Sequence, residues 1–162
     1  MDEATKGLYR QALGCFATGV AVVTVADGAK TVGLTVNSFT SLSLDPPLVL
    51  WCLGKASDRG VWFLASDRFV VNILGAEDAP LAASCARRGA YVVDPARVDA
   101  GRPGEPAIEG ALARLYCRNH ERVAIGDHLI MIGEVTSFES REGDGLTYFR
   151  SRYGRAVLSE EA

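Results

Sequence analysis

The sequence lacks the cysteine patterns of a metal site or a disulfide framework. It has only four cysteines, Cys15, Cys52, Cys85 and Cys117, and no two of them are separated by two residues. Structural zinc sites usually bring such close pairs together, so we expect no metal site. Cys52 lies inside an apolar run, where a buried thiol is the ordinary interpretation. Free thiols are typical of a reducing compartment, and we therefore expect a cytoplasmic protein.

The sequence also lacks long hydrophobic runs and any excess of positive charge. No stretch approaches the ~18 consecutive apolar residues of a membrane span. The first ten residues, MDEATKGLYR, are polar and acidic, so we expect no secretory signal. The chain has 17 Lys and Arg against 20 Asp and Glu, a net charge of −3, and the two signs are mixed along it. We expect neither a membrane nor a nucleic-acid partner, because the latter requires concentrated positive charge.

Two nucleotide motifs and one nucleophile motif are missing as well. There is no G-x-G-x-x-G after an expected strand. Gly54-Lys55 is not a P-loop, because Val49 stands where the first glycine belongs and Ala56 follows the lysine. Neither His120 nor His128 accompanies a G-x-S-x-G motif, which disfavours a Ser-His-Asp hydrolase.

What the sequence does have is the pattern of one mainly β domain. A chain of 162 residues most naturally forms one domain, here 1–162. Asp27-Gly28 is typical of a tight hairpin turn. Successive strands joined by short turns predict an antiparallel sheet, closed or nearly closed into a barrel, with a few short helices. We expect strands at 20–25, 30–37, 48–53, 68–74, 111–122, 127–138 and 146–150, helices at 3–17, 57–65 and 77–88, and a surface excursion at 94–106.

Short polar side chains crowd the segment 35–43, between two apolar strands. They could form a loop whose hydroxyls bond the local backbone. They could instead form a ligand rim, since short side chains let a flat ligand approach the backbone. Lys55 and Ser57 follow one strand later, where a helix start would suit a phosphate, although Ser57 could simply cap that helix. Taken together, the two features predict a phosphorylated heterocycle lying across adjacent strand ends.

The order of several motifs resembles the short-chain flavin reductases, the reductase components of two-component flavin-dependent monooxygenases. The resemblance covers about residues 5 to 157. It implies an FMN-binding split barrel, antiparallel and Greek-key-like, that is usually a homodimer, binds FMN or FAD, takes hydride from NADH or NADPH, and supplies reduced flavin to a partner monooxygenase. The motifs that carry it are Phe16-Ala-Thr-Gly-Val20, Gly33-Leu-Thr-Val-Asn-Ser-Phe39, Ser43-Leu-x-Pro-Pro-Leu48, Phe69-Val-Val-Asn-Ile-Leu74, Gly126-Asp-His128, Ile132-Gly-Glu-Val135 and Tyr148-Phe-Arg-Ser-Arg-Tyr153.

The resemblance also implies the site residues. His128 would lie near the nicotinamide as the catalytic residue. Arg87 and Arg88 would meet the flavin pyrophosphate, although charge at a helix C-terminus is also favourable in itself. The polar edge of the flavin would meet Thr35, Val36, Asn37, Ser38 and Ser41. Its phosphate end would meet Cys52, Leu53, Lys55 and Ser57. The nicotinamide would be covered by Tyr148, Arg150, Arg152 and Tyr153, although the last three could equally form a solvated tail.

Two other functions fit the same sequence. One is a split-barrel flavoprotein of another activity, such as a pyridoxamine-phosphate-oxidase-like enzyme or a flavin-binding sensor. The other is a dimeric interaction module without enzymatic activity. Oxidation of NAD(P)H that depends on added flavin separates the first from a reductase, and thermal stabilisation by flavin counts against the second. Fold alone does not decide between them.

Overall fold

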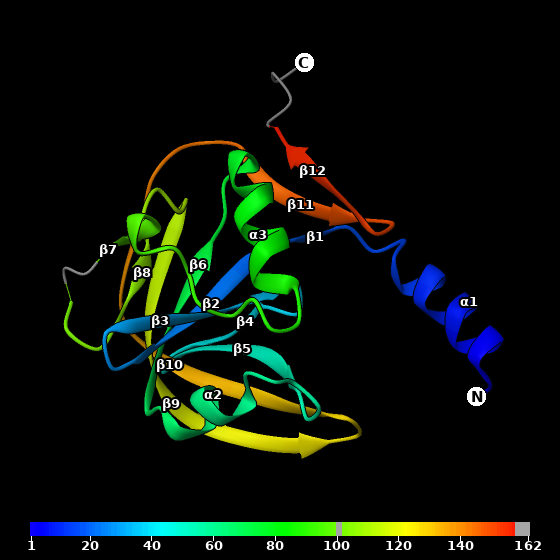
Figure 1. The fold of residues 1–162 in the computed structure, drawn as a ribbon, viewed down its shortest axis with the longest axis horizontal. Coiled ribbons are helices and arrows are strands. Elements are labelled where there is room, and N and C mark those ends of the chain that lie inside the picture. The colour runs from blue at the N-terminus through cyan, green and yellow to red at the C-terminus, as the bar shows by residue number, and fades with distance from the viewer. Residues whose placement is uncertain (100–101, 158–162) are drawn as a thin grey trace.

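The structure is a computed structural model that describes residues 1–99 and 102–157. The expected mainly β, antiparallel fold is confirmed (Figure 1). The main sheet has seven strands in the order β3-β2-β6-β9-β10-β5-β4, and each strand is antiparallel to its neighbours. These strands are β2 (Ala21–Asp27), β3 (Lys30–Val36), β4 (Thr40–Leu44), β5 (Pro47–Gly54), β6 (Arg68–Ile73), β9 (Ala113–Ile125) and β10 (His128–Ser140).

The remaining elements flank this sheet. A three-stranded sheet has the order β1-β11-β12, and β7 pairs with β8. In Figure 1, α3 covers β2 and β3. The helix α2 lies against β2, and the Leu64 carbonyl near its end accepts a hydrogen bond from Arg122 of β9. The bounds are β1 (Thr18–Gly19), β7 (Val98–Asp99), β8 (Ala107–Ile108), β11 (Gly145–Phe149), β12 (Arg152–Ala156), α1 (Glu3–Leu13), α2 (Gly60–Ala65), α3 (Ala79–Ala86), and two 3₁₀ turns, η1 (Ala76–Asp78) and η2 (Pro95–Arg97).

Two hairpins, the one predicted at Asp27-Gly28 and another at Gly126, form because their turn residues can adopt a left-handed backbone. Gly28 between β2 and β3 has φ +58°, and Gly126 between β9 and β10 has φ +51°. A residue with a Cβ adopts this conformation only with strain, whereas glycine does not. Each turn fixes where the next strand begins, β3 at Lys30 and β10 at His128.

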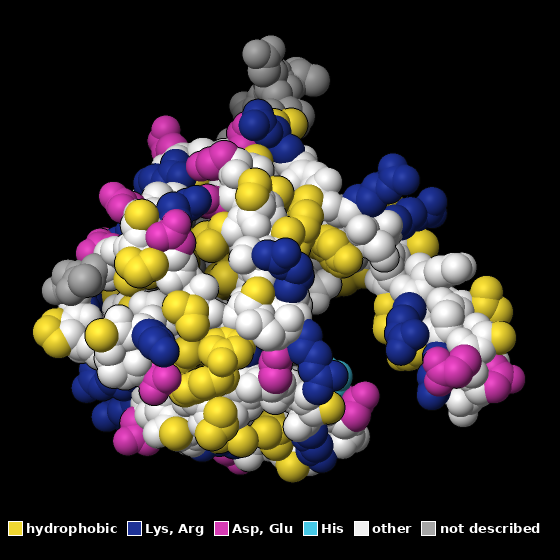
Figure 2. All heavy atoms as spheres, in the orientation of Figure 1, with side chains coloured by type: hydrophobic (Ala, Val, Ile, Leu, Met, Phe, Trp, Pro, Cys, Tyr) yellow, Lys and Arg dark blue, Asp and Glu magenta, His cyan; other side chains and the backbone are white. Residues whose placement is uncertain are grey.

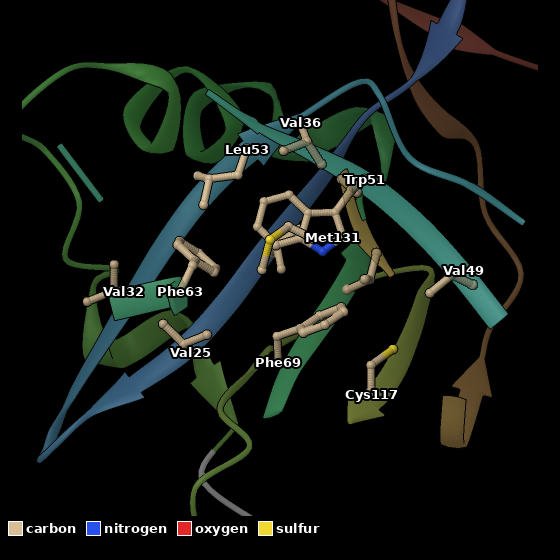
Figure 3. Packing of buried hydrophobic residues seen from close by; sticks show 13 residues of the cluster. Val25, Val32, Val36, Val49, Trp51, Leu53, Phe63, Phe69, Cys117 and Met131 are labelled. Atoms are coloured by element: carbon tan, nitrogen blue, oxygen red, sulfur yellow. The ribbon is translucent and has the colours of Figure 1, made fainter. Parts of the chain in front are cut away.

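An aromatic cluster fills the inside of the main sheet (Figure 3). Trp51 is fully buried, and its ring meets Phe63 at 5.2 Å and Phe69 at 5.8 Å, both edge to face. Burying each of these side chains stabilises the fold by about 1.5–3 kcal/mol. Side chains alternate along β5, so while Val49, Trp51 and Leu53 point into the core, Cys52 and Gly54 lie on the opposite face.

One buried polar residue links three strands, β2, β6 and β8. Asn72 on β6 is fully buried. Its amide nitrogen donates to the Val22 carbonyl at 2.9 Å and to the Thr24 hydroxyl at 3.0 Å. Its amide oxygen accepts from the Ile108 N–H at 2.7 Å. The asparagine thereby holds β8 against the central strands.

The N-terminal helix differs from the prediction. It ends at Leu13 rather than at residue 17, and none of its residues is buried. Tyr9 is 53% exposed and Phe16, beyond the helix, is 77% exposed. Figure 1 shows α1 standing away from the two sheets. The apolar stripe that the sequence predicts is real, but it has no partner within the described part of this chain.

Other predicted boundaries need smaller corrections. The helix expected from residue 57 begins at Gly60, so Ser57 does not cap it. The helix expected at 77–88 is divided into η1 and α3 and ends at Ala86. Five strands were not predicted, namely β4, β12 and the two-residue strands β1, β7 and β8. The excursion at 94–106 contains η2 and β7, with residues 100 and 101 outside the described residues. No helix within the described ranges is both long and apolar enough to cross a bilayer.

Candidate functional site

A groove of about 450 Å³ opens where β3 and β5 end beside the β9–β10 turn. We call it the strand-end groove. Pockets of 300–1,000 Å³ are the usual size for small ligands and cofactors. Its wall combines consecutive residues of β3 with residues of β5 whose side chains point away from the core. The alternate side chains of β5 are buried in the core. It is lined by Leu34, Thr35, Val36, Asn37, Ser38, Cys52, Gly54, Ala56, Ser57, Asp127 and His128.

The polar residues at the end of β3 have divided roles. The Ser38 hydroxyl accepts a hydrogen bond from the Cys52 N–H at 2.9 Å, so this backbone donor of β5 bonds a side chain instead of a neighbouring strand. The Thr35 hydroxyl donates to the Ala82 carbonyl of α3 at 2.7 Å. Asn37 is exposed, and its amide has no hydrogen-bond partner among the described residues. Asn37 and the Ser38 hydroxyl proton therefore remain available to a ligand.

Three other predicted flavin residues lie away from the groove surface. Ser41 is exposed on β4, where it pairs with Val49, and it does not line the groove. The Leu53 side chain is 1% exposed and packs in the aromatic cluster. The Lys55 ammonium donates to the Gly126 carbonyl at 2.8 Å, which ties its loop to the β9–β10 turn. The loop backbone is tied at the same place by the Lys55 N–H to the Asp127 carbonyl, 2.9 Å away.

Two of the predicted phosphate residues, Arg87 and Arg88, do not line the groove but lie in a turn next to the loop that carries Ser57. Arg87 and Arg88 are exposed directly after α3. The turn that contains them touches the loop that carries Ser57, because the Gly89 N–H donates to Asp58 at 2.7 Å. Figure 2 shows both Lys or Arg and Asp or Glu side chains near the visible His side chain, below the lower end of α3. This end of the groove suits a phosphate group.

His128 stands at the other side of the groove, at the first residue of β10. Its Nδ1 is 2.7 Å from the Asp127 carboxylate. The hydrogen bond from His128 holds the pKa of Asp127 below its usual value, so the carboxylate is ionised at neutral pH. A carboxylate only accepts hydrogen bonds, so Nδ1 carries the proton and Nε2 is free. A Cβ added to Gly54 would lie 3.7 Å from Nε2, which places that nitrogen beside the groove floor.

The four residues predicted to cover the nicotinamide lie on β11, on β12 and in the turn between them. Tyr148 reaches a second cavity of about 520 Å³, which it shares with Asn37, Thr18 and the end of α1. Asn37 thus joins this cavity to the strand-end groove. The Tyr153 ring lies 5.3 Å from that of Tyr148 and packs on the core side. Arg150 and Arg152 are exposed, and Arg150 borders a further cavity beside α1.

Sequence reasoning missed four groove residues. Leu34, Gly54, Ala56 and Asp127 line the groove without having been predicted. For Gly54 and Ala56 the available signal was their small size beside a predicted phosphate loop. For Asp127 the available signal was its position directly before His128, where a carboxylate can fix the tautomer of the ring. Within residues 1–99 and 102–157, no group of three or more His, Cys, Asp or Glu side chains could hold a metal ion.

Comparisons with known proteins agree on one family. The chain matches the model of the flavin reductase like domain over residues 13–156. An FMN reductase (NADH) of Agrobacterium fabrum is 42% identical over 147 residues, which cover 91% of this chain and 84% of that protein. The reductase component of a 4-nitrophenol 4-monooxygenase/4-nitrocatechol 2-monooxygenase of Rhodococcus opacus is 35% identical over 157 residues, covering 97% and 84%. The structure of an NADH:FAD oxidoreductase of Streptomyces globisporus C-1027, in complex with NAD and FAD fragments, matches with a TM-score of 0.90 at 35% identity, covering 99% of this chain and 98% of that one.

Proposed function

The chain belongs to the family of flavin reductase like domains, and we propose that its strand-end groove holds the flavin that it reduces. The protein is an NAD(P)H:flavin oxidoreductase, and it works with FMN or FAD and with NADH, as its relatives do. The reduced flavin serves a partner monooxygenase, as in the two-component system of Rhodococcus opacus. The predicted family, activity and cofactors are thereby confirmed, and the placement of each cofactor on this chain is the proposal.

The observation that carries the proposal is the composition of the strand-end groove. Its floor is made of Gly54, Ala56 and Cys52, whose small side chains leave room for a flat ring system. The Asn37 amide and the Ser38 hydroxyl can meet a ring edge rich in carbonyl and N–H groups. The exposed arginines after α3 lie at one end only, so a ligand with one apolar and one phosphorylated end has a single favourable orientation. The residues present fit a flavin.

The protein residues bind and orient, since the cofactors carry the redox chemistry. When bound, the flavin accepts a hydride from the nicotinamide. We assign to His128 the contact with the nicotinamide, because its Nε2 is free beside the groove. Asp127 accepts a hydrogen bond from Nδ1 and so orients the ring with Nε2 beside the groove. Tyr148, which borders the adjoining cavity, would limit the access of water to the nicotinamide side.

The first prediction concerns turnover. The purified chain should oxidise NADH only when FMN or FAD is added, because the hydride acceptor is not a protein group. The measurement is a steady-state assay at 340 nm that crosses the two flavins with NADH and NADPH. Oxidation without flavin, or none with either flavin, would refute the proposed function.

The variant His128→Ala separates the two cofactors in this assay. Loss of about one hydrogen bond, worth roughly 0.5–1.5 kcal/mol, should raise the Michaelis constant for NADH or lower turnover several-fold. Flavin affinity should stay close to that of the wild type. A variant that loses flavin binding instead would place His128 against the flavin.

We also propose that the protein is a homodimer in the cytoplasm. Support for the dimer comes from α1 and its continuation, whose exposed apolar side chains include Leu8, Tyr9, Leu13 and Phe16. Contiguous exposed apolar surface of this kind usually marks an interaction site. A second copy of the chain could cover it. Four free cysteines support a reducing compartment.

Light scattering at micromolar concentration should therefore give twice the mass of one chain. The double variant Leu8→Asp/Leu13→Asp should shift the mass toward one chain, because two buried carboxylates would oppose association. Substitution of Gly7 by Asp is the matched control, as this residue adds no apolar surface to α1. A wild-type monomer under these conditions would contradict the proposal.

A further inference from the structure

Arg59 is a buried cation that does not line the strand-end groove. Its residue is 4% exposed, in the loop between β5 and α2. A charged side chain this deeply buried is unfavourable unless hydrogen bonds and an opposite charge offset the loss of water. The contacts of Arg59 therefore indicate what keeps it there.

These contacts connect the Arg59 side chain, directly or through Asp58, to the turn after α3. One terminal nitrogen of Arg59 lies 3.3 Å from the carboxylate of Asp58, and the other donates to the Arg87 carbonyl. The second carboxylate oxygen of Asp58 accepts from the Gly89 N–H at 2.7 Å. Two adjacent residues of one loop thus hold the first and last residues of the turn 87–89. We call Asp58, Arg59 and their two contacts on this turn the loop clasp.

The loop clasp also connects to the groove itself. Ser57, which lines the groove, accepts a hydrogen bond from the Arg59 N–H through its hydroxyl at 3.2 Å. The rings of Trp62 and Tyr91 meet at 4.6 Å just beyond the clasp and join the same two segments again. The Arg59 Nε–H has no partner in the described chain, so the two terminal nitrogens make the directional contacts of this guanidinium. Arg59 and Asp58 therefore make the hydrogen bonds that hold the turn next to Ser57, and the Trp62–Tyr91 contact adds to them.

We propose that Arg59 and Asp58 are positioning residues for the phosphate end of the flavin. They act through the turn 87–89, which they hold so that the exposed side chains of Arg87 and Arg88 stand beside Ser57. Arg59 itself does not touch the ligand. The inference rests on the proposed flavin site. It adds that the loop clasp supports the binding of one chemical class there, a phosphate monoester or diester attached to the ring system.

The test compares a flavin that has a phosphate with one that lacks it. FMN and riboflavin share the ring and the ribityl chain, so the ratio of their dissociation constants isolates the phosphate contribution. In Arg59→Met, FMN affinity measured by fluorescence quenching should fall about three- to tenfold while riboflavin affinity is unchanged. Arg59→Lys keeps the charge and one donor, and it should restore part of the ratio.

Arg122→Met is the matched control. Arg122 also donates to backbone carbonyls, those of Leu64 at 2.9 Å and Ser66 at 3.0 Å, at the other end of α2. It should lower thermal stability without changing the ratio of FMN to riboflavin affinity. If Arg59→Met fails to fold, Asp58→Ala releases the Gly89 N–H by replacing a side chain that is less buried than Arg59, and it should show the same selective loss for FMN.

Each outcome decides the proposal. An equal loss for both flavins, or no loss for either in folded variants of Arg59 and Asp58, would overturn the clasp as a phosphate support. A wild-type chain that binds FMN and riboflavin equally well would overturn the clasp but leave the flavin site in place. A wild-type chain that binds neither flavin would overturn the proposed function and the clasp with it.

Discussion

Replacing Asn72 by alanine should destabilise the fold by about 3 kcal/mol, since each buried polar group left without a partner costs roughly 1–3 kcal/mol. The Ile108 N–H would lose its acceptor, and the Thr24 hydroxyl and the Val22 carbonyl would lose a donor. A small cavity between β2, β6 and β8 adds to the loss. For a chain of this length, the midpoint of thermal unfolding should fall by roughly 6–12 °C.

Asn119→Ala is the matched control for this change. Asn119 is half-buried on the neighbouring strand β9, and its amide nitrogen donates to the Ser66 carbonyl at 2.5 Å. Its amide oxygen is already without a partner in the described chain, so the substitution removes one bond and one unpaired group together. The loss should be about 1 kcal/mol or less. Equal losses at the two positions, measured by urea unfolding, would show that Asn72 is not the link between β8 and the central strands.

Strand periodicity allowed most of the main sheet to be predicted, and composition and turn chemistry explain why the two longest of the missed strands, β4 and β12, were not found. The strand β4 lies in a run of serines and threonines, a composition more typical of loops than of strands. The strand β12 follows a turn made by Arg150 and Ser151, which have φ +46° and +63°. Tight hairpin turns at positive φ usually contain glycine or asparagine, and Arg150 and Ser151 are neither, so no sequence pattern indicates a hairpin turn here.

The polar run at the end of β3 shows what a sequence does not distinguish. The hydroxyls of Ser38 and Thr35 do not bond the local backbone, because Ser38 accepts from a backbone N–H of β5 and Thr35 donates to a carbonyl of α3. Those partners lie 14 and 47 residues away along the chain, which no local pattern predicts. Asn37, between them, keeps its amide exposed toward the groove. The same run therefore closes the sheet edge and leaves a polar rim.

The apolar stripe of α1 shows the opposite case. The spacing of Leu8, Tyr9 and Leu13 predicts an amphipathic helix, and the helix is there. Periodicity says that one face will be covered, but it does not say by what. Here these side chains remain exposed, and α1 stands away from the main sheet (Figure 1). The sequence alone could not separate an intramolecular core from an intermolecular contact.

Removing both arginines after α3 should weaken FMN binding by about ten- to a hundredfold, because one charge-assisted contact is worth roughly 1.5–3 kcal/mol. The double variant is Arg87→Ala/Arg88→Ala, and both side chains are exposed, so the fold should be retained. Riboflavin, which has no phosphate, should bind as it does to the wild type. Raising the ionic strength should reduce the difference between wild type and variant, since salt screens exposed charges.

The control for this variant must remove the same charge elsewhere. Arg118→Ala/Arg122→Ala does so on β9, where Arg118 pairs with Glu134 at 2.9 Å and neither residue lines the groove. A general loss of positive field would weaken FMN binding equally in both double variants, whereas a contact at the Ser57 end affects only the first. Titration of flavin fluorescence at two salt concentrations distinguishes the two. An unchanged FMN dissociation constant in the folded Arg87→Ala/Arg88→Ala protein would place the phosphate elsewhere, and those arginines would then serve only as favourable charge at the C-terminus of α3.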